Sequence, residues 1–85
     1  MKTVILNKMK EMLKNTGYEN AEHLTMNSNI TEAGITSLMY IQVIVELELF
    51  YDIEINPDYM FVTSEDTIQK IVDEVAAKLD QKNDK

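Results

Sequence analysis

Ser37 is the side chain that raises the question of chemistry in this sequence. It lies in the stretch GITSLMYIQVIVELELFYDIEI, residues 34–55. A serine hydroxyl becomes a nucleophile when a base lies within hydrogen-bond reach. The chain has one histidine, His23, with no obvious orienting partner, and it has no cysteine. Ser37 can therefore be read as a simple helix-capping residue, or as an attachment point for a group that another protein delivers.

Other catalytic and metal-binding arrangements are not recognisable in the sequence. One histidine with scattered carboxylates lacks the spacing of a zinc or calcium site. No glycine-rich phosphate-binding loop is present. The sequence therefore does not indicate an enzyme.

The charges are divided unevenly along the chain. The formal net charge is -7, and all the basic residues are lysines. Between residues 15 and 69 every charged residue is acidic. A field of one sign attracts cationic protein surfaces and repels nucleic acid, although acidic residues also serve simply to keep a small protein soluble. We expect protein partners and no nucleic acid.

The length and composition predict a small soluble domain. A chain of 85 residues forms one domain at most. We assign it to residues 1–80 and expect 81–85 to be a frayed tail.

The absence of cysteine excludes disulfides and thiolate metal sites. No signal peptide is visible, and no apolar run approaches the roughly 20 residues of a membrane span, so we expect a cytoplasmic monomer without membrane contact.

The spacing of apolar residues predicts an all-α fold, a small four-helix bundle of three main helices and one short helix. The first helix is expected over residues 3–14 and the second over 37–51, with Thr36 as its N-cap. A long loop separates them. A short helix is expected from Pro57, which suits a first helical position. The last helix is expected over 63–79, because Thr63 and Asp66 resemble a capping box.

The apolar residues expected to face the core follow from the same spacing. The first helix contributes Ile5, Met9, Met12 and Leu13, and the last contributes Ile68, Ile71, Val72, Val75 and Leu79. The loop is expected to be pinned to the core by Leu24, Met26, Ile30 and Ile35.

The second helix is apolar on nearly every side, which is unusual for a surface helix. We expect one face to be core, made of Ile41, Ile44, either Leu47 or Glu48, and Tyr51. The opposite faces still hold apolar residues, namely Leu38, Met39, Val43, Val45 and Leu49. Two apolar faces indicate two contacts, one with the core and one with an external partner.

These residues resemble the acyl carrier and peptidyl carrier protein family. In that family a G-x-x-S-L element begins the second helix, and its serine receives a 4′-phosphopantetheine arm from coenzyme A. Here the element reads Gly34-Ile35-Thr36-Ser37-Leu38. The preceding LTMNSNITEAG, the closing FYDIEI and the later EDTIQKIVDEV also resemble family segments. The resemblance covers about the whole chain and implies the same four-helix layout.

The resemblance implies a role for each matching residue. Ser37 would hold the arm, whose terminal thiol would carry an acyl or aminoacyl group as a thioester. The surface that partners contact would include Leu38. Family positions at the partner face or the acyl pocket are matched by Val45, Glu46, Glu48 and Ile55, although each could equally be plain core or a solvated face. The implied partners are a phosphopantetheinyl transferase and the loading and condensing enzymes of fatty-acid, polyketide or nonribosomal peptide synthesis. Their docking surfaces would be basic or apolar.

The chain departs from the fatty-acid carriers at three partner-facing positions. Thr36 stands where many have aspartate, and Met39 and Gln42 stand where acids are common. SLMYIQ is closer to the S-L-x-x-I-Q of peptidyl carriers, which favours a free-standing carrier of a specialised pathway. Contacts at Met39 and Val43 would then bury apolar surface. The alternative is a carrier-like docking module that is never modified. The apolar residues Ile44, Leu47, Ile55 and Ile68 suit either a packed core or an acyl pocket.

Overall fold

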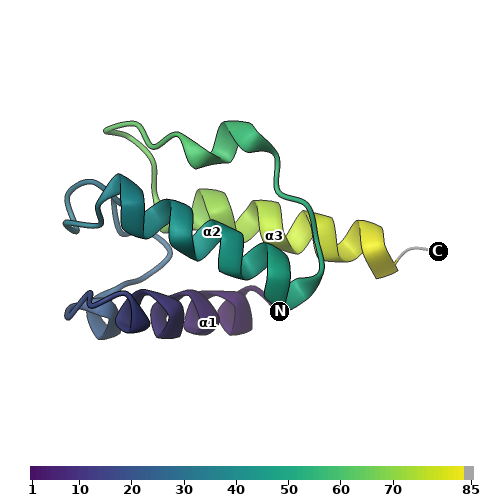
Figure 1. The fold of residues 1–85 in the computed structure, drawn as a ribbon, viewed down its shortest axis with the longest axis horizontal. Helices are drawn as coiled ribbons and strands as arrows, with labels where there is room; N and C mark the ends of the chain where they lie inside the picture. The colour runs from purple at the N-terminus through teal and green to yellow at the C-terminus, as the bar shows by residue number, and fades with distance from the viewer. Residues whose placement is uncertain (84–85) are drawn as a thin grey trace.

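Three helices lie side by side in the computed structural model, which describes residues 1–83 (Figure 1). They are α1 (Lys2–Asn15), α2 (Ser37–Tyr51) and α3 (Ile68–Asn83). Two short 3-10 helices lie in the connections, η1 (Ala21–His23) and η2 (Pro57–Met60). No strand occurs within residues 1–83. The all-α fold predicted from the sequence is confirmed, and so is the long loop after the first helix.

The core is built from the stripe of apolar residues on each helix. Ile5 and Leu13 of α1, Ile44 of α2, and Ile71 and Val75 of α3 are each at most 1% exposed. No buried polar or charged residue accompanies them among the residues described. Burying such side chains removes apolar surface from water, which is the main favourable term in folding.

The long loop between α1 and α2 is held on the core as the sequence predicts. Leu24, Ile30 and Ile35 are buried, and Met26 packs partly against the core. The Tyr18 hydroxyl at the start of the loop donates a hydrogen bond to the carbonyl of Ala33 near its end. The loop therefore delivers the chain to the start of α2 from a defined position.

The inward face of α2 differs from the prediction. The helix has the predicted bounds, but Val43 is 1% exposed and Ile41 is 38% exposed. The expectation that Ile41 is core and that Val43 faces a partner is therefore wrong. In a helix that is apolar all round, periodicity does not identify the inner face, and contact with α1 and α3 decides it.

The start of the last helix is also corrected. Thr63 and Asp66 form their own turn, in which the Thr63 N–H donates to the Asp66 carboxylate at 2.9 Å. The helix begins only at Ile68. Its first N–H groups are satisfied by the long loop instead, because Ile68 donates to the Ser28 carbonyl at 3.0 Å and Gln69 donates to the Met26 carbonyl at 2.9 Å. The short helix at Pro57 is a single 3-10 turn, not an α-helix.

The end of α3 lies against the end of α2. The Lys82 ammonium donates to the carbonyls of Tyr51 at 3.0 Å and Asp52 at 3.1 Å, which are unpaired groups at the α2 C-terminus. Asp52 itself takes the left-handed conformation that ends the helix, with φ 53°. A frayed tail was expected over 81–85, whereas α3 continues to Asn83, and residues 84–85 lie outside those described.

Asp66 makes folding stability depend on pH. The Thr63 N–H and the Lys70 ammonium both bind its carboxylate, and the backbone hydrogen bond is the main reason that its pKa lies below the ordinary 3.8. Because the pKa of Asp66 is lower in the folded chain than its ordinary value, the ionised carboxylate stabilises the fold at pH values above that ordinary pKa. This contribution is lost as the pH falls through the pKa that Asp66 has in the folded chain. We expect Asp66→Asn to lose up to about 1 kcal/mol at pH 7. Urea unfolding should show wild type and variant converging below pH 3.8, and a constant difference would contradict the assignment.

Candidate functional site

Ser37 is the first residue of α2, and its neighbour Thr36 caps the helix. Thr36 has an extended backbone, and its hydroxyl oxygen accepts the N–H of Met39 at 3.1 Å. Ser37 is exposed, and its hydroxyl makes no hydrogen bond within residues 1–83. The predicted cap at Thr36 is confirmed. Thr36 therefore caps the helix, and the hydroxyl of Ser37 is exposed to solvent.

The chain reaches Ser37 through a tight turn at Gly34. The Ala33 N–H donates to the Asn29 carbonyl at 2.9 Å, and the Gly34 N–H donates to the Thr31 carbonyl at 3.1 Å. Gly34 then adopts a φ of +81°, which other residues enter only at a cost. The next residue, Ile35, is buried. Gly34 thus turns the chain and Ile35 anchors it on the core. Together they place Ser37 at the start of the helix.

The start of α2 suits a negatively charged group. The free N–H groups and the dipole of a helix N-terminus favour anions. The first turn of α2 carries no acidic residue that would compete. A phosphodiester on the Ser37 oxygen would therefore lie where negative charge is best tolerated, and the open hydroxyl fits such a group.

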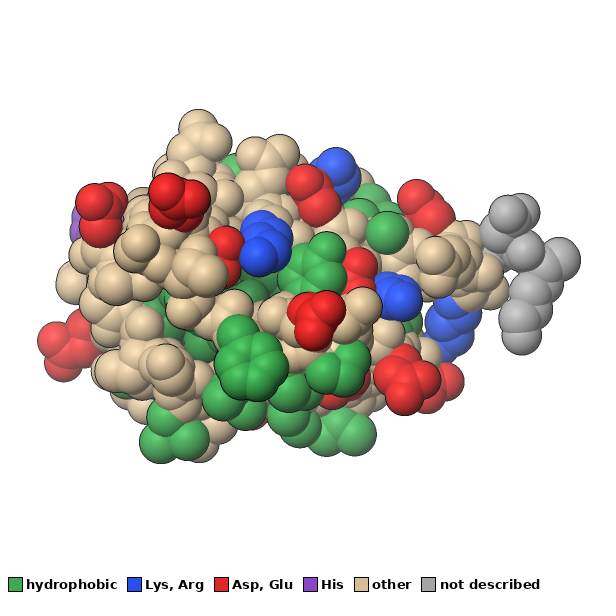
Figure 2. All heavy atoms as spheres, turned by 90° about the horizontal axis from the view of Figure 1, so that it is seen from above, with side chains coloured by type: hydrophobic (Ala, Val, Ile, Leu, Met, Phe, Trp, Pro, Cys, Tyr) green, Lys and Arg blue, Asp and Glu red, His purple; other side chains and the backbone are tan. Residues whose placement is uncertain are grey.

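An apolar stripe runs along the outside of α2 from this end. It consists of Leu38, Ile41, Val45 and Leu49, which are 38–78% exposed and recur at helical spacing. Figure 2, viewed from the side of η2, shows hydrophobic side chains gathered along one edge between scattered carboxylates. An exposed stripe of this kind marks a contact surface. Sequence reasoning missed Ile41 because it was assigned to the core.

Comparison with known families decides the class of protein. A family model described as "Phosphopantetheine attachment site" matches residues 4–75, from the first turn of α1 into α3. The chain belongs to this phosphopantetheine attachment family. Searches of curated proteins and of solved structures returned no significant match.

Family membership establishes the general role of the domain. Domains of this family are sites of covalent 4′-phosphopantetheine attachment, and the chain is a carrier protein in this general sense. Carrier domains of this kind interact with phosphopantetheinyl transferases and with synthase enzymes. They are generally not catalysts themselves. Within residues 1–83 no cluster of metal-ligating side chains occurs, and none of the helices is long and apolar enough to cross a membrane.

The carrier's other predicted partner residues fall into different environments. Gln42 and Glu46 are exposed beside Val45, where α2 faces the end of α1. Met39 is half-buried and packs against the core. These side chains lie on the same outer part of α2 as Leu38, with Met39 turned furthest inward.

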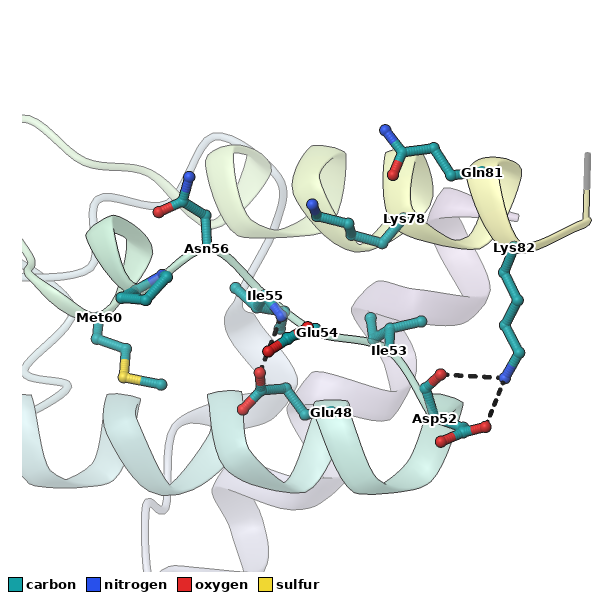
Figure 3. Close-up of a pocket in the computed structure, with 11 residues that line it drawn as sticks. Glu48, Asp52, Ile53, Glu54, Ile55, Asn56, Met60, Lys78, Gln81 and Lys82 are labelled. Atoms are coloured by element: carbon teal, nitrogen blue, oxygen red, sulfur yellow. Dashed lines mark hydrogen bonds and ion pairs between the residues drawn. The ribbon is translucent and has the colours of Figure 1, made fainter.

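Glu48 and Ile55 are linked to each other and not to the outer stripe. The Ile55 N–H donates to the Glu48 carboxylate at 2.9 Å, which holds the segment after α2 against the helix (Figure 3). The Ile55 side chain is 2% exposed. Of the roles considered for Ile55, an exposed position on a partner surface is ruled out, because its side chain faces the core. The carrier therefore uses Glu48 at least partly as an internal hydrogen-bond acceptor.

A shallow pocket lies beside this link, between the end of α2 and the end of α3. It is lined by Glu48, Ile53, Ile55 and Met60 on one side and by Lys78 and Lys82 on the other (Figure 3). Ile44, Leu47 and Ile68, which suited either a core or an acyl pocket, are each at most 1% exposed and packed together. In this structure they form core.

Proposed function

We propose that this carrier holds acyl or aminoacyl intermediates on a 4′-phosphopantetheine arm attached to Ser37 and presents them to biosynthetic enzymes. The observation that carries the proposal is the open hydroxyl of Ser37 at a helix end that Thr36 already caps. Family membership supports the arm, and the G-x-x-S-L element supports the serine.

The attachment needs no base from this chain. The Ser37 oxygen would form a bond to the phosphorus of coenzyme A that carries the pantetheine. The pyrophosphate bond would break and release adenosine 3′,5′-bisphosphate, and the hydroxyl proton would pass to a base of the transferase. The helix N-terminus then faces the new phosphodiester. The bound arm supplies a terminal thiol that holds cargo as a thioester. The chain has no cysteine, so its own side chains offer no competing thiol.

The docking surface supports a carrier of a specialised pathway. The positions around Ser37 are filled by Thr36, Leu38 and Met39, where a strongly acidic surface would have carboxylates. A transferase or condensing enzyme that reads this surface would bury Leu38 and Ile41 in an apolar depression and place a cation near Glu46. The S-L-x-x-I-Q pattern, which resembles that of peptidyl carriers, favours a specialised pathway over housekeeping fatty-acid synthesis.

An unmodified docking module is the second candidate. Thr36 in place of aspartate favours it, because a transferase that requires the acid would not modify the chain. In that case the stripe on α2 would serve protein contact alone. Partner binding would then be independent of the Ser37 hydroxyl.

Intact mass spectrometry distinguishes the two candidates. The full chain is incubated with coenzyme A, magnesium and a broad-specificity phosphopantetheinyl transferase, and a second transferase is used in parallel. We expect a single phosphopantetheine adduct, which fragmentation should locate on Ser37. An adduct on any other residue, or none with either enzyme, would refute the attachment and favour the docking module.

A further inference from the structure

Tyr40 carries a hydroxyl that neither the fold nor the attachment at Ser37 uses. Its ring lies in the core, and the residue is only 4% exposed. Yet the hydroxyl makes no hydrogen bond to any other residue in the described part of the chain, residues 1–83. No fully enclosed side-chain oxygen or nitrogen lacks a partner in that range, so the hydroxyl must reach the surface at its tip. A buried tyrosine usually finds a partner for its O–H. Tyr40 therefore presents an unpaired hydrogen-bond donor at the end of a buried ring.

The position of Tyr40 in α2 places this donor next to Ser37. Residues three apart are neighbours on the surface of a helix. The two residues are separated by about 4.5 Å along the helix axis. Long side chains of a helix lean back toward its N-terminus, so the ring of Tyr40 is directed over the turn that begins with Ser37. A group attached to the Ser37 oxygen thus starts beside the ring of Tyr40.

Groups from two other segments surround the Tyr40 hydroxyl. The 3-10 helix η2 contacts α2, and the segment that follows it turns back toward the start of α3 (Figure 1). Burial is the main reason that the pKa of Tyr40 is raised, and the nearby carboxylate of Asp66 and hydroxyl of Tyr59 raise this pKa further. The Asp66 carboxylate itself is bound by the Thr63 N–H at 2.9 Å and the Lys70 ammonium at 3.1 Å. The Tyr40 hydroxyl therefore stays protonated at neutral pH and can donate.

These surroundings favour a neutral acceptor over a charged one. An anion beside the Tyr40 hydroxyl would be repelled by Asp66, and a cation would compete with Lys70, which already pairs with Asp66. A carbonyl oxygen has neither difficulty, and it accepts readily from a phenolic O–H. The pantetheine arm carries amide carbonyls and would begin at the neighbouring Ser37.

We propose that the Tyr40 hydroxyl donates a hydrogen bond to an amide carbonyl of the pantetheine arm. Tyr40 is then a positioning residue, which directs the arm from Ser37 toward η2. The exposed stripe that begins at Leu38 and Ile41 lies on the outer side of α2. An arm held at Tyr40 leaves this stripe free for an enzyme to bind.

The proposal rests on the proposed function, because it assigns a contact to the arm on Ser37. The two are nevertheless separable. Tyr40→Phe is expected to be loaded at Ser37 like wild type, because the variant keeps the serine and the helix start. If no form of the chain is loaded, attachment has failed and the contact is tested without a transferase. Ser37→Cys is then alkylated with an iodoacetamide that carries the same amide chain.

The test is NMR of the full chain carrying an arm labelled with ¹³C at its amide carbonyls. At least one carbonyl resonance should be displaced downfield from its position in free pantetheine. Tyr40→Phe removes only the hydroxyl and should return that resonance to the free position. Tyr51→Phe is the matched control, because Tyr51 is a half-buried tyrosine at the other end of α2. It should leave the displacement unchanged.

Urea unfolding of the chain without the arm separates positioning of the arm from support of the fold. Tyr40→Phe should unfold at the same urea concentration as wild type, because its hydroxyl has no partner in the fold to lose. A clearly lower midpoint would assign the hydroxyl a structural role instead. The proposal is also overturned if no carbonyl resonance is displaced in wild type, if the displacement survives Tyr40→Phe, or if Tyr51→Phe abolishes it equally.

Discussion

Ser37→Ala is expected to abolish phosphopantetheine loading while the fold remains intact. Loading requires an oxygen nucleophile at the start of α2, and alanine removes it. The structure also predicts little effect on stability. Thr36, not Ser37, accepts the capping hydrogen bond from Met39, and alanine is a good helix former. We expect the free energy of unfolding to change by less than about 0.5 kcal/mol. Intact mass after incubation with transferase and urea unfolding measure the two effects.

Thr36→Ala is the matched control, because it removes a hydroxyl one residue away. It should cost about 1 kcal/mol of stability through loss of the cap. It should still be loaded at Ser37 under conditions in which it remains folded. If Ser37→Ala destabilises the chain as much as Thr36→Ala, or if Ser37→Ala is still loaded, the separation of cap from attachment point is wrong.

Leu47→Ala is expected to have the largest effect on stability. Leu47 is fully buried between the helices, and truncation of a buried leucine costs about 2–5 kcal/mol because a cavity remains. A domain of this size is stable by only roughly 4 to 13 kcal/mol. The variant should therefore unfold at a much lower urea concentration. If the wild-type stability lies at the lower end of this range, a loss of about 5 kcal/mol leaves the variant largely unfolded without denaturant.

Leu49→Ala provides the comparison on the same helix. Leu49 lies two residues further on and is 78% exposed, so its truncation should change stability by less than about 0.5 kcal/mol. Thermal and urea unfolding of both variants measure the contrast. Similar losses for the two leucines would mean that the inner face of α2 is assigned wrongly.

The local features of the site could be predicted from the sequence. The start of α2 depends on Thr36, whose hydroxyl reaches an N–H only three residues away, and the turn before it depends on Gly34. The bounds of α1 and α2 and the apolar stripes of α1 and α3 likewise follow from residues within a turn or two of each other. Such signals are contained in the local sequence, and this is why Ser37 could be singled out before the fold was known.

The packing of distant segments was decided only by the tertiary structure. The choice of Val43 over Ile41 as core depends on where α1 and α3 lie, because α2 is apolar on both sides. The N–H groups at the start of α3 donate to the carbonyls of Ser28 and Met26, which lie about 40 residues earlier in the chain. The local sequence around Thr63 does not contain this information, and the start of the helix predicted there was therefore wrong.

The same reason explains the environments of Ile55 and Phe50. Ile55 is buried because Glu48 holds the chain against α2, and Phe50 is positioned by Lys8 from another helix. Periodicity within one segment reports which side chains share a face. The free energy of burial depends on what the rest of the chain places against that face, and only the assembled bundle determines this.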